Sequence, residues 1–244
     1  MNALMFAAQE VPHFHSAQGF PLLSALVVVP FVAALIVLLL PKQRIDVIRM
    51  VGILGSVATG VLAAYMLTRF KVGNPGYQMV TDHVWIRSFG IHWKLGVDGI
   101  SLFLVALTGL LFPLALLGPV VNDNVKPYIA WLLIREAACM GTFLALDLFM
   151  FFVFFEVVLV PMYFLIANWG HGRRDYAAMK FFLYTLAGSA FLLVGMLTLV
   201  FLHARGGNTL TFDVVTLMKD PGVSTQTARW LFLAFAVAFA VKVP

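Results

Sequence analysis

The stretch LFMFFVFFEVVLVPMYFLIAN, residues 148–168, decides the architecture of this chain. Its 21 residues are almost all apolar and are long enough to cross a bilayer as a helix. Glu156 is the ninth of them, about 12 Å from the start of such a helix at about 1.5 Å per residue. A carboxylate at that depth costs about 2.5–3.5 kcal/mol on insertion scales. Because an apolar anchor does not need this residue, Glu156 is the first candidate functional residue, as a proton carrier or a cation ligand.

The composition also indicates a helical membrane protein. The chain is 62% hydrophobic and only 11% charged, whereas soluble domains have about 25% charged residues. Because the chain has one cysteine, Cys139, it can form neither an internal disulfide nor a cysteine-ligated cluster of its own. The histidines lack the spacing of metal ligands. We interpret the net charge of +5 as a topology signal and not as a nucleic-acid-binding surface.

The apolar runs predict an all-α polytopic membrane protein with about six complete transmembrane helices and a truncated, broken seventh. We expect two parts: residues 1–126, with three spans and an extramembrane hairpin in 68–98, and residues 127–244, with the other spans. Because the last run stops inside an apolar helix, we expect a fragment of a longer protein. The expected spans are 20–40, 47–67, 100–117, 127–146, 148–168, 178–202 and 230–244, and residues 1–19 are expected at the membrane interface.

Prolines and small residues predict the finer features of these spans. Pro30 and Pro113 predict a kink and an interruption in the first and third spans, and Pro161 predicts a kink beside Glu156. Small residues recur every four positions in the second span and predict one packing stripe: Gly52, Ser56, Gly60 and Ala64. Turns are expected near residues 82–83 and 89–90 of the hairpin, and a short interfacial helix over 212–218.

Basic residues in the short loops predict the orientation. The loop after the first span and the loop after the fifth are rich in Lys and Arg, whereas the connection between spans four and five has none. Cytoplasmic loops carry the excess of these residues. The N-terminus is therefore expected outside, and the loop at residues 171–174 in the cytoplasm.

Four further charged residues lie within or near the spans. Arg135 and Glu136 point about 100° apart on a helix, so each is expected to contact a different neighbour, in a functional or a purely structural pair. Lys180 is either functional or a lysine that extends toward the headgroups. Lys242 lies at mid-membrane depth just before Pro244, which predicts a broken helix beside a hydrated cavity unless the lysine merely sits near an artificial end.

Together these charges predict a proton relay. Burial and ion pairing act in opposite directions on a side-chain pKa, so a Glu–Lys pair whose contact changes can take up and release protons. Polar side chains along such a path would come from the fifth and sixth spans: Tyr163, Tyr184, Thr185, Ser189 and His203.

Several segments resemble one known family. FFEVVLVPMYFLI at 154–166, AMKFFLYT at 178–185 and AFAVAFAVKVP at 234–244 are similar to subunit M, or chain 4, of the proton-pumping NADH:quinone oxidoreductase, respiratory complex I. GVDGIS at 96–101 is similar as well. The resemblance implies part of a fourteen-helix antiporter-like fold with two inverted repeats, each containing a broken helix.

The same resemblance implies the roles of four residues. Glu156 matches the essential glutamate of the family, Lys242 the lysine at the helix break, Lys180 a further lysine, and Glu136 a glutamate found in many members. Arg135 has no counterpart. No cofactor or metal is expected in this chain. Flavin, iron–sulfur clusters and quinone are expected in partner subunits, among membrane neighbours of the L and N types in a bacterial inner membrane.

Other interpretations stay open. The chain is otherwise a subunit of an Mrp-type cation/proton antiporter, a membrane-bound hydrogenase or a photosynthetic NDH-type complex, or a non-functional truncated membrane fragment. Flavin and iron–sulfur partners would indicate an oxidoreductase, and other antiporter subunits alone would indicate the Mrp type.

Overall fold

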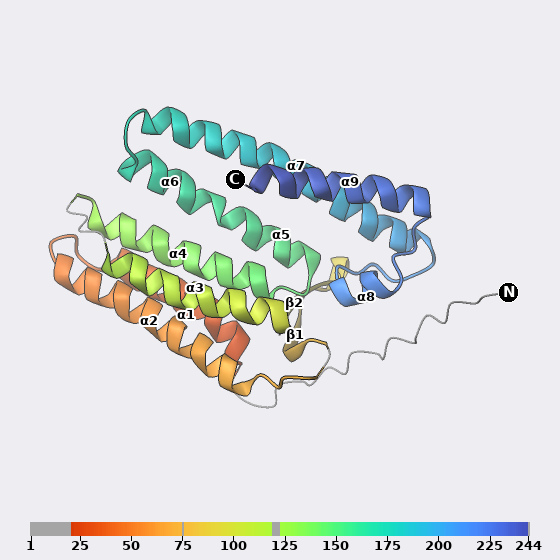
Figure 1. The fold of residues 1–244 in the computed structure, drawn as a ribbon, viewed down its shortest axis with the longest axis horizontal. Coiled ribbons are helices and arrows are strands. Elements are labelled where there is room, and N and C mark those ends of the chain that lie inside the picture. The colour runs from red at the N-terminus through yellow and green to blue at the C-terminus, as the bar shows by residue number, and fades with distance from the viewer. Residues whose placement is uncertain (1–20, 75, 119–122, 244) are drawn as a thin grey trace.

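The computed structural model describes residues 21–74, 76–118 and 123–243, which form an antiparallel helical bundle with a hairpin and a short helix at one end (Figure 1). The elements are α1 (Leu22–Leu39), α2 (Ile45–Arg69), β1 (Gln78–Ile86), the 3-10 turn η1 (Arg87–Phe89), β2 (Ile91–Val97), α3 (Gly99–Leu117), α4 (Val125–Leu144), α5 (Leu148–Val157), α6 (Leu159–Trp169), α7 (Arg174–Arg205), α8 (Val214–Lys219) and α9 (Thr225–Lys242).

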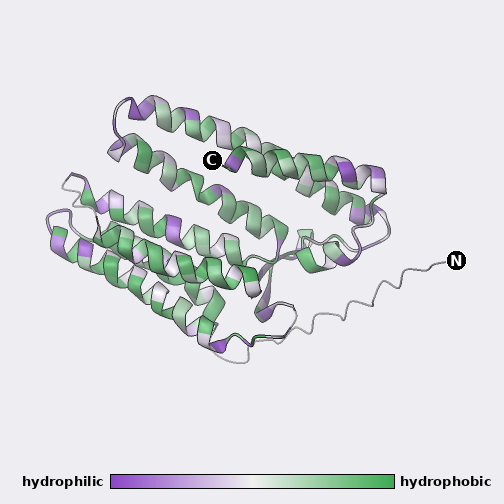
Figure 2. Ribbon diagram, viewed as in Figure 1, coloured by the Kyte–Doolittle hydropathy of each residue, from purple (hydrophilic) through white to green (hydrophobic). Residues whose placement is uncertain are grey.

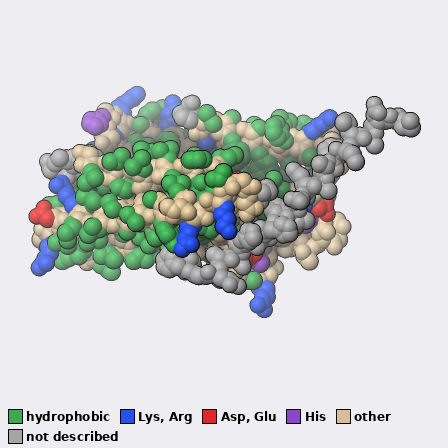
Figure 3. Space-filling model, turned by 60° about the horizontal axis from the view of Figure 1, so that its bottom comes forward, with side chains coloured by type: hydrophobic (Ala, Val, Ile, Leu, Met, Phe, Trp, Pro, Cys, Tyr) green, Lys and Arg blue, Asp and Glu red, His purple; other side chains and the backbone are tan. Residues whose placement is uncertain are grey.

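Within the described residues, five helical segments are long and apolar enough to cross a membrane: α1, α2, α3, α5–α6 and α7. Hydrophobic residues dominate these helices (Figure 2), and hydrophobic side chains cover much of the face that Figure 3 shows. The other two long helices are more polar: α4 carries Lys126, Arg135 and Glu136, and α9 carries Arg229 and ends at Lys242. With 20 residues, about 30 Å at 1.5 Å per residue, α4 still matches the hydrocarbon thickness and completes six spans.

The charged helix α4 is enclosed by other helices. It packs against α1, α2, α3, α5 and α6. Many of its side chains are fully buried, including Leu133, Met140 and Leu144. Charged side chains are costly in hydrocarbon, so a helix that carries two near its middle is stable only where protein surrounds it.

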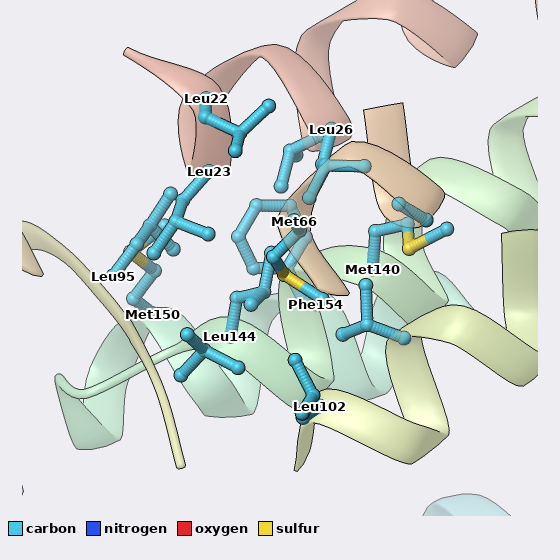
Figure 4. Close-up of a cluster of buried hydrophobic side chains, with 14 residues drawn as sticks. Leu22, Leu23, Leu26, Met66, Leu95, Leu102, Met140, Leu144, Met150 and Phe154 are labelled. Carbon is cyan, nitrogen blue, oxygen red and sulfur yellow. The ribbon is translucent and has the colours of Figure 1, made fainter. Parts of the chain in front are cut away.

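The main buried cluster joins the hairpin to the first half of the bundle (Figure 4). It combines Leu22 and Leu26 of α1 with Met140 of α4 and Phe154 of α5. The Phe154 ring also contacts the backbone of α4, since a Cβ added at Gly141 would overlap with that ring. This contact fixes the face that α5 turns toward α4.

Small residues allow α2 to approach its neighbours closely. A Cβ added at Gly52 would collide with Ile129 of α4, and one at Gly60 with the carbonyl oxygen of Gly109 on α3. The predicted stripe is confirmed at these glycines and at the buried Ser56, but it is wrong at Ala64, which is exposed. Ala63 is buried instead, because a four-residue repeat drifts around a helix with 3.6 residues per turn.

The expected interruption at Pro113 is wrong, because α3 is continuous through it. A proline cannot donate to the carbonyl four residues earlier, which is that of Gly109. That carbonyl lies against Gly60 of α2. Packing by a neighbouring helix lets such a helix stay continuous, and α1 likewise runs through Pro30.

The expected hairpin is confirmed, with one of its two expected turns. β1 and β2 pair antiparallel, with Asp82 opposite Lys94 and Ile86 opposite Ile91. The chain reverses over residues 87–90, where Gly90 has a φ of 62°, whereas residues 82–83 lie within β1. Glycine tolerates positive φ without steric cost, which explains the turn at this position.

The buried carboxylate of Asp147 joins three parts of the chain. It accepts hydrogen bonds from the backbone N–H groups of His92, Phe149 and Met150, at 2.9–3.1 Å. Burial raises the pKa of Asp147, and the three donors offset this only in part. The backbone next to Asp147 also donates two hydrogen bonds. Leu146 N–H donates to the carbonyl of Lys94 in β2, and Leu148 N–H donates to the carbonyl of Phe212, just before α8. Asp147 therefore caps α5 and ties α5 to the hairpin and to the segment before α8.

An ion-pair network closes this junction. Lys94 Nζ lies 2.9 Å from Asp213 and 3.7 Å from Asp82, which contacts His92 Nδ1 at 2.6 Å. Burial favours a higher pKa for Asp213, but the Thr216 hydroxyl and the Lys94 ammonium outweigh it and hold the pKa below the ordinary value of 3.8. The ionised form of Asp213 therefore stabilises the fold.

Two expected helix starts differ from the structure. The seventh helix begins at Thr225 and not near residue 230, because Ser224 caps it by accepting from Thr227 N–H. The interfacial helix, expected over 212–218, spans Val214–Lys219 with Asp213 as its cap. In both cases a capping side chain fixes the boundary, which hydrophobicity alone does not mark.

We predict that Gly60→Val destabilises the protein by about 1–3 kcal/mol, as overpacking does elsewhere. The added side chain would force α2 away from the Gly109 carbonyl. Thermal unfolding of the purified protein in detergent would show the loss. Gly99→Ala is the control, since a Cβ there has open space, and an equal loss in the control would contradict the proposed close contact.

We predict that Asp213→Asn lowers stability at pH 7 by about 1–2 kcal/mol, because the buried Lys94 ammonium loses its 2.9 Å ion pair with the Asp213 carboxylate. The pKa of Asp213 is depressed in the folded state, so its contribution is full above pH 3.8 and is lost as the pH falls through the folded-state pKa. Melting temperatures from pH 7 to pH 3 should therefore converge with wild type at the acidic end. Asp175→Asn, at an exposed carboxylate, should change little at any pH.

Candidate functional site: the Glu156–Lys242 pair

The fifth span is divided beside Glu156. α5 ends at Val157 and α6 begins at Leu159, with Val158 still in helical conformation (φ −58°, ψ −31°). Pro161 has no N–H to donate to the carbonyl of Val157, so this turn lacks one helical hydrogen bond. The helix is interrupted at Val158, close to Pro161, and Glu156 lies in the last turn before the interruption, whereas the kink itself stays a prediction.

Glu156 meets a lysine from the far end of the chain. Lys242 Nζ of α9 lies 3.8 Å from Glu156 Oε1, and both side chains are largely buried. The distance is too long for a hydrogen bond, and this oxygen has no hydrogen-bond partner among the described residues. The pair is therefore in electrostatic contact without being locked in a fixed geometry.

The Lys242 ammonium has a second contact on the same helix as Glu156. It lies 4.0 Å from the centre of the Phe155 ring. A cation over an aromatic face is attracted by the ring quadrupole. Phe155 can thus hold the ammonium whether or not Glu156 is charged, and the lysine can leave Glu156 without losing every partner.

Helix packing determines where Lys242 lies. α9 runs against α7, where Gly188 makes room for Val241 and Gly195 for Phe235. A Cβ at either glycine would approach those side chains to 2.9 Å or less. Figure 1 shows α9 ending near the middle of the bundle, beside α5 and α6. The expected break at Pro244 lies outside the described residues.

Glu136 lies elsewhere, inside the interface of α4 with α2. It is fully buried, and neither carboxylate oxygen has a hydrogen-bond partner among the described residues. The buried Ser56 hydroxyl of α2 interacts with this carboxylate, although no well-formed hydrogen bond joins them. Such a pair of unsatisfied buried groups is costly unless water or a proton occupies the site.

Arg135 and Glu136 contact different neighbours, as expected from the helix geometry. Arg135 lies over the Phe112 ring at 5.8 Å, and within the described residues it forms no ion pair. Within the described residues Arg135 therefore contacts an aromatic ring of α3, and a structural ion pair between spans stays a prediction.

The other predicted polar residues do not join the Glu156–Lys242 pair in the described structure. Lys180 is exposed and lies over the Tyr176 ring at 5.9 Å. Thr185 and Ser189 donate to carbonyls of their own helix. His203 is buried with Nδ1 unpartnered, and Tyr163 packs on Phe182.

Sequence reasoning missed two residues of this arrangement. Phe155 escaped notice because phenylalanines surround it, and no sequence signal distinguishes the one that meets Lys242. Asp147 carried a usable signal, because an Asp directly before an apolar helix is a preferred N-cap. No cluster of three metal-binding side chains forms among the residues that the structure describes.

The structure defines a helical membrane protein with paired charges beside an interrupted helix. Residues 145–244 match the family described as NADH:quinone oxidoreductase/Mrp antiporter, TM.

The names of individual relatives are more specific than the description of the family. The chain is 36% identical over 232 residues to NADH-quinone oxidoreductase subunit M of Rickettsia felis, covering 92% of this chain and 46% of the relative. It is 42% identical over 207 residues to subunit M of Rhodobacter capsulatus, covering 80% of this chain and 39% of the relative. A chain of respiratory complex I from Thermus thermophilus with bound NADH is similar in structure, with a TM-score of 0.77 and 29% identity, over 91% of this chain and 44% of that one. The chain thus spans about half the length of the curated relatives it matches.

Proposed function

We propose that this chain is the N-terminal half of the proton-translocating M-type subunit of a bacterial NADH:quinone oxidoreductase. The observation that carries the proposal is the 3.8 Å approach of Lys242 to Glu156 beside a helix break. A carboxylate and an ammonium at this spacing stabilise each other's charged forms, and separation removes that stabilisation. A conformational change that moves Lys242 would therefore make Glu156 take up a proton.

Electron transfer would take place in partner subunits. Flavin, iron–sulfur clusters and quinone would be bound there, and this chain would hold none of them. Its neighbours would be L-type and N-type membrane subunits, in the bacterial inner membrane with the N-terminus outside. The residues 127–244 would form the first repeat of the antiporter-like fold, and Glu136 and Lys180 would extend the relay from Glu156.

An Mrp-type cation/proton antiporter subunit is the second candidate, because the matching family covers both kinds of complex. Partners that co-purify with the full-length protein distinguish the two functions. Flavin and iron–sulfur proteins support the oxidoreductase, whereas antiporter subunits alone support the Mrp type.

We predict that Glu156→Gln in the full-length protein abolishes most proton pumping while the complex still assembles. Glutamine keeps the shape and hydrogen-bonding capacity of the side chain but cannot carry the proton. Proton uptake per quinone reduced, in vesicles with the reconstituted complex, measures the effect. Glu156→Asp should retain part of the activity, and Asp175→Asn all of it. Wild-type pumping by Glu156→Gln would rule out the relay role.

We predict that Lys242→Ala cripples pumping and that Lys242→Arg restores it poorly, because arginine stays protonated under all useful conditions. The same vesicle assay applies, with Lys219→Ala at an exposed position as the control. If the arginine variant pumped like wild type, Lys242 would be a fixed charge and not a proton carrier. If the alanine variant did so too, Lys242 would have no part in the mechanism.

A further inference from the structure

A basic hollow lies at the end of the bundle where α1 joins α2 and α4 begins. Two adjoining hollows of about 540 and 420 Å³ share Ile45 and Val125 as lining residues. We call them together the basic hollow, because four basic side chains and one acidic side chain line them: Lys42, Arg44, Arg49, Lys126 and Asp46. Figure 3 shows basic side chains around an acidic one at the left end, where Figure 1 places the α1–α2 loop.

Part of this charge is available to a ligand. Lys42 and Arg44 are exposed, and neither forms an ion pair within the described residues. Lys126 Nζ donates to the Leu40 carbonyl at 2.8 Å, which holds the start of α4 against the end of α1. The basic hollow is therefore built from three segments that are fixed to one another.

Backbone dipoles add to the positive potential. Both α2 and α4 begin at the basic hollow, and neither Arg44 nor Asn124 caps its helix with a side chain. First-turn N–H groups of a helix have no intrahelical partners and favour anions. Two helix N-termini and four basic side chains thus make the electrostatic potential of the basic hollow more positive, and the carboxylate of Asp46 opposes them.

Part of the wall of the basic hollow is apolar. Leu38, Ile45 and Val47 line it, together with the shared Val125. Beyond it, exposed apolar side chains continue on α1 and α2, including Leu35, Leu39 and Leu54. A ligand that fits this surface combines an anionic head with a hydrophobic tail.

We propose that the basic hollow binds the phosphate headgroup of an anionic phospholipid, whose acyl chains lie along α1 and α2. Basic pockets between transmembrane helices at a membrane surface are suited to such headgroups. Free phosphate shares the headgroup chemistry, but the apolar walls favour the lipid. This site is separate from the Glu156–Lys242 pair and does not depend on the proposed function.

Site-specific photo-crosslinking in the full-length protein within its native complex tests the proposal. A benzophenone amino acid replaces Gln43, which lines the basic hollow. The complex is placed in nanodiscs of phosphatidylcholine with a minor fraction of phosphatidylglycerol. Mass spectrometry of the crosslinked peptide then gives the ratio of the two lipids. We expect phosphatidylglycerol in clear excess over its mole fraction.

Matched variants separate a built site from general surface charge. Lys42→Gln with Arg44→Gln should lower the enrichment by about an order of magnitude. Lys42→Arg with Arg44→Lys should preserve it. Arg173→Gln with Arg174→Gln removes the same charge from the α6–α7 loop, at the same end of the bundle (Figure 1), and should leave the enrichment at Gln43 unchanged.

Three results would overturn the proposal. Equal enrichment with the photoreactive residue at His171, in the α6–α7 loop, would indicate attraction to the whole surface. Full enrichment in the Lys42→Gln, Arg44→Gln variant would exclude these side chains as the binding groups. Loss of enrichment in excess inorganic phosphate, but not in chloride of equal ionic strength, would make the basic hollow an ion site and not a lipid site.

Discussion

The buried carboxylate of Asp147 is the constraint on which the rest of this structure depends. It holds three backbone N–H groups, two in the first turn of α5 and one in the hairpin, and the adjacent backbone bonds to the segment that leads into α8. A buried carboxylate is tolerated only when its hydrogen-bonding capacity is used in this way. The depth of Glu156 follows from this cap, nine residues, or about 13 Å, further along the helix. The same junction also fixes the segment from which α8 starts.

The second organising constraint is the cost of charge in hydrocarbon. The five apolar segments tolerate lipid contact, whereas α4 carries Arg135 and Glu136 and is surrounded by five helices. Small residues of α2 make this enclosure tight, because Gly52 and Gly60 admit side-chain and backbone atoms where any Cβ would collide. Packing and electrostatics thus act together: close helix contact excludes lipid from the charged positions, and the charges specify which helix must be central.

The Glu156–Lys242 contact is looser than a hydrogen-bonded salt bridge. A buried ion pair with ideal hydrogen bonds is rigid, and breaking it costs several kcal/mol. Here the oxygen–nitrogen distance is 3.8 Å, the helix beside Glu156 lacks one hydrogen bond, and Phe155 offers the ammonium an alternative partner. Each of these features lowers the cost of separating the two charges, as the proposed proton relay would require.

The sequence by itself determined the membrane class, the approximate spans, the hairpin and the break at Pro161, because hydrophobic period, length and proline chemistry are local properties. It also singled out Glu156 and Lys242, since charge within an apolar run is visible without coordinates. Only the tertiary structure decided that these two residues meet, that Phe155 shares the lysine, and that Glu136 lies apart from them against α2. Those facts depend on how α9 packs on α7 and on how closely α2 approaches α4, and contacts between helices far apart in the chain leave no periodic signal in one sequence.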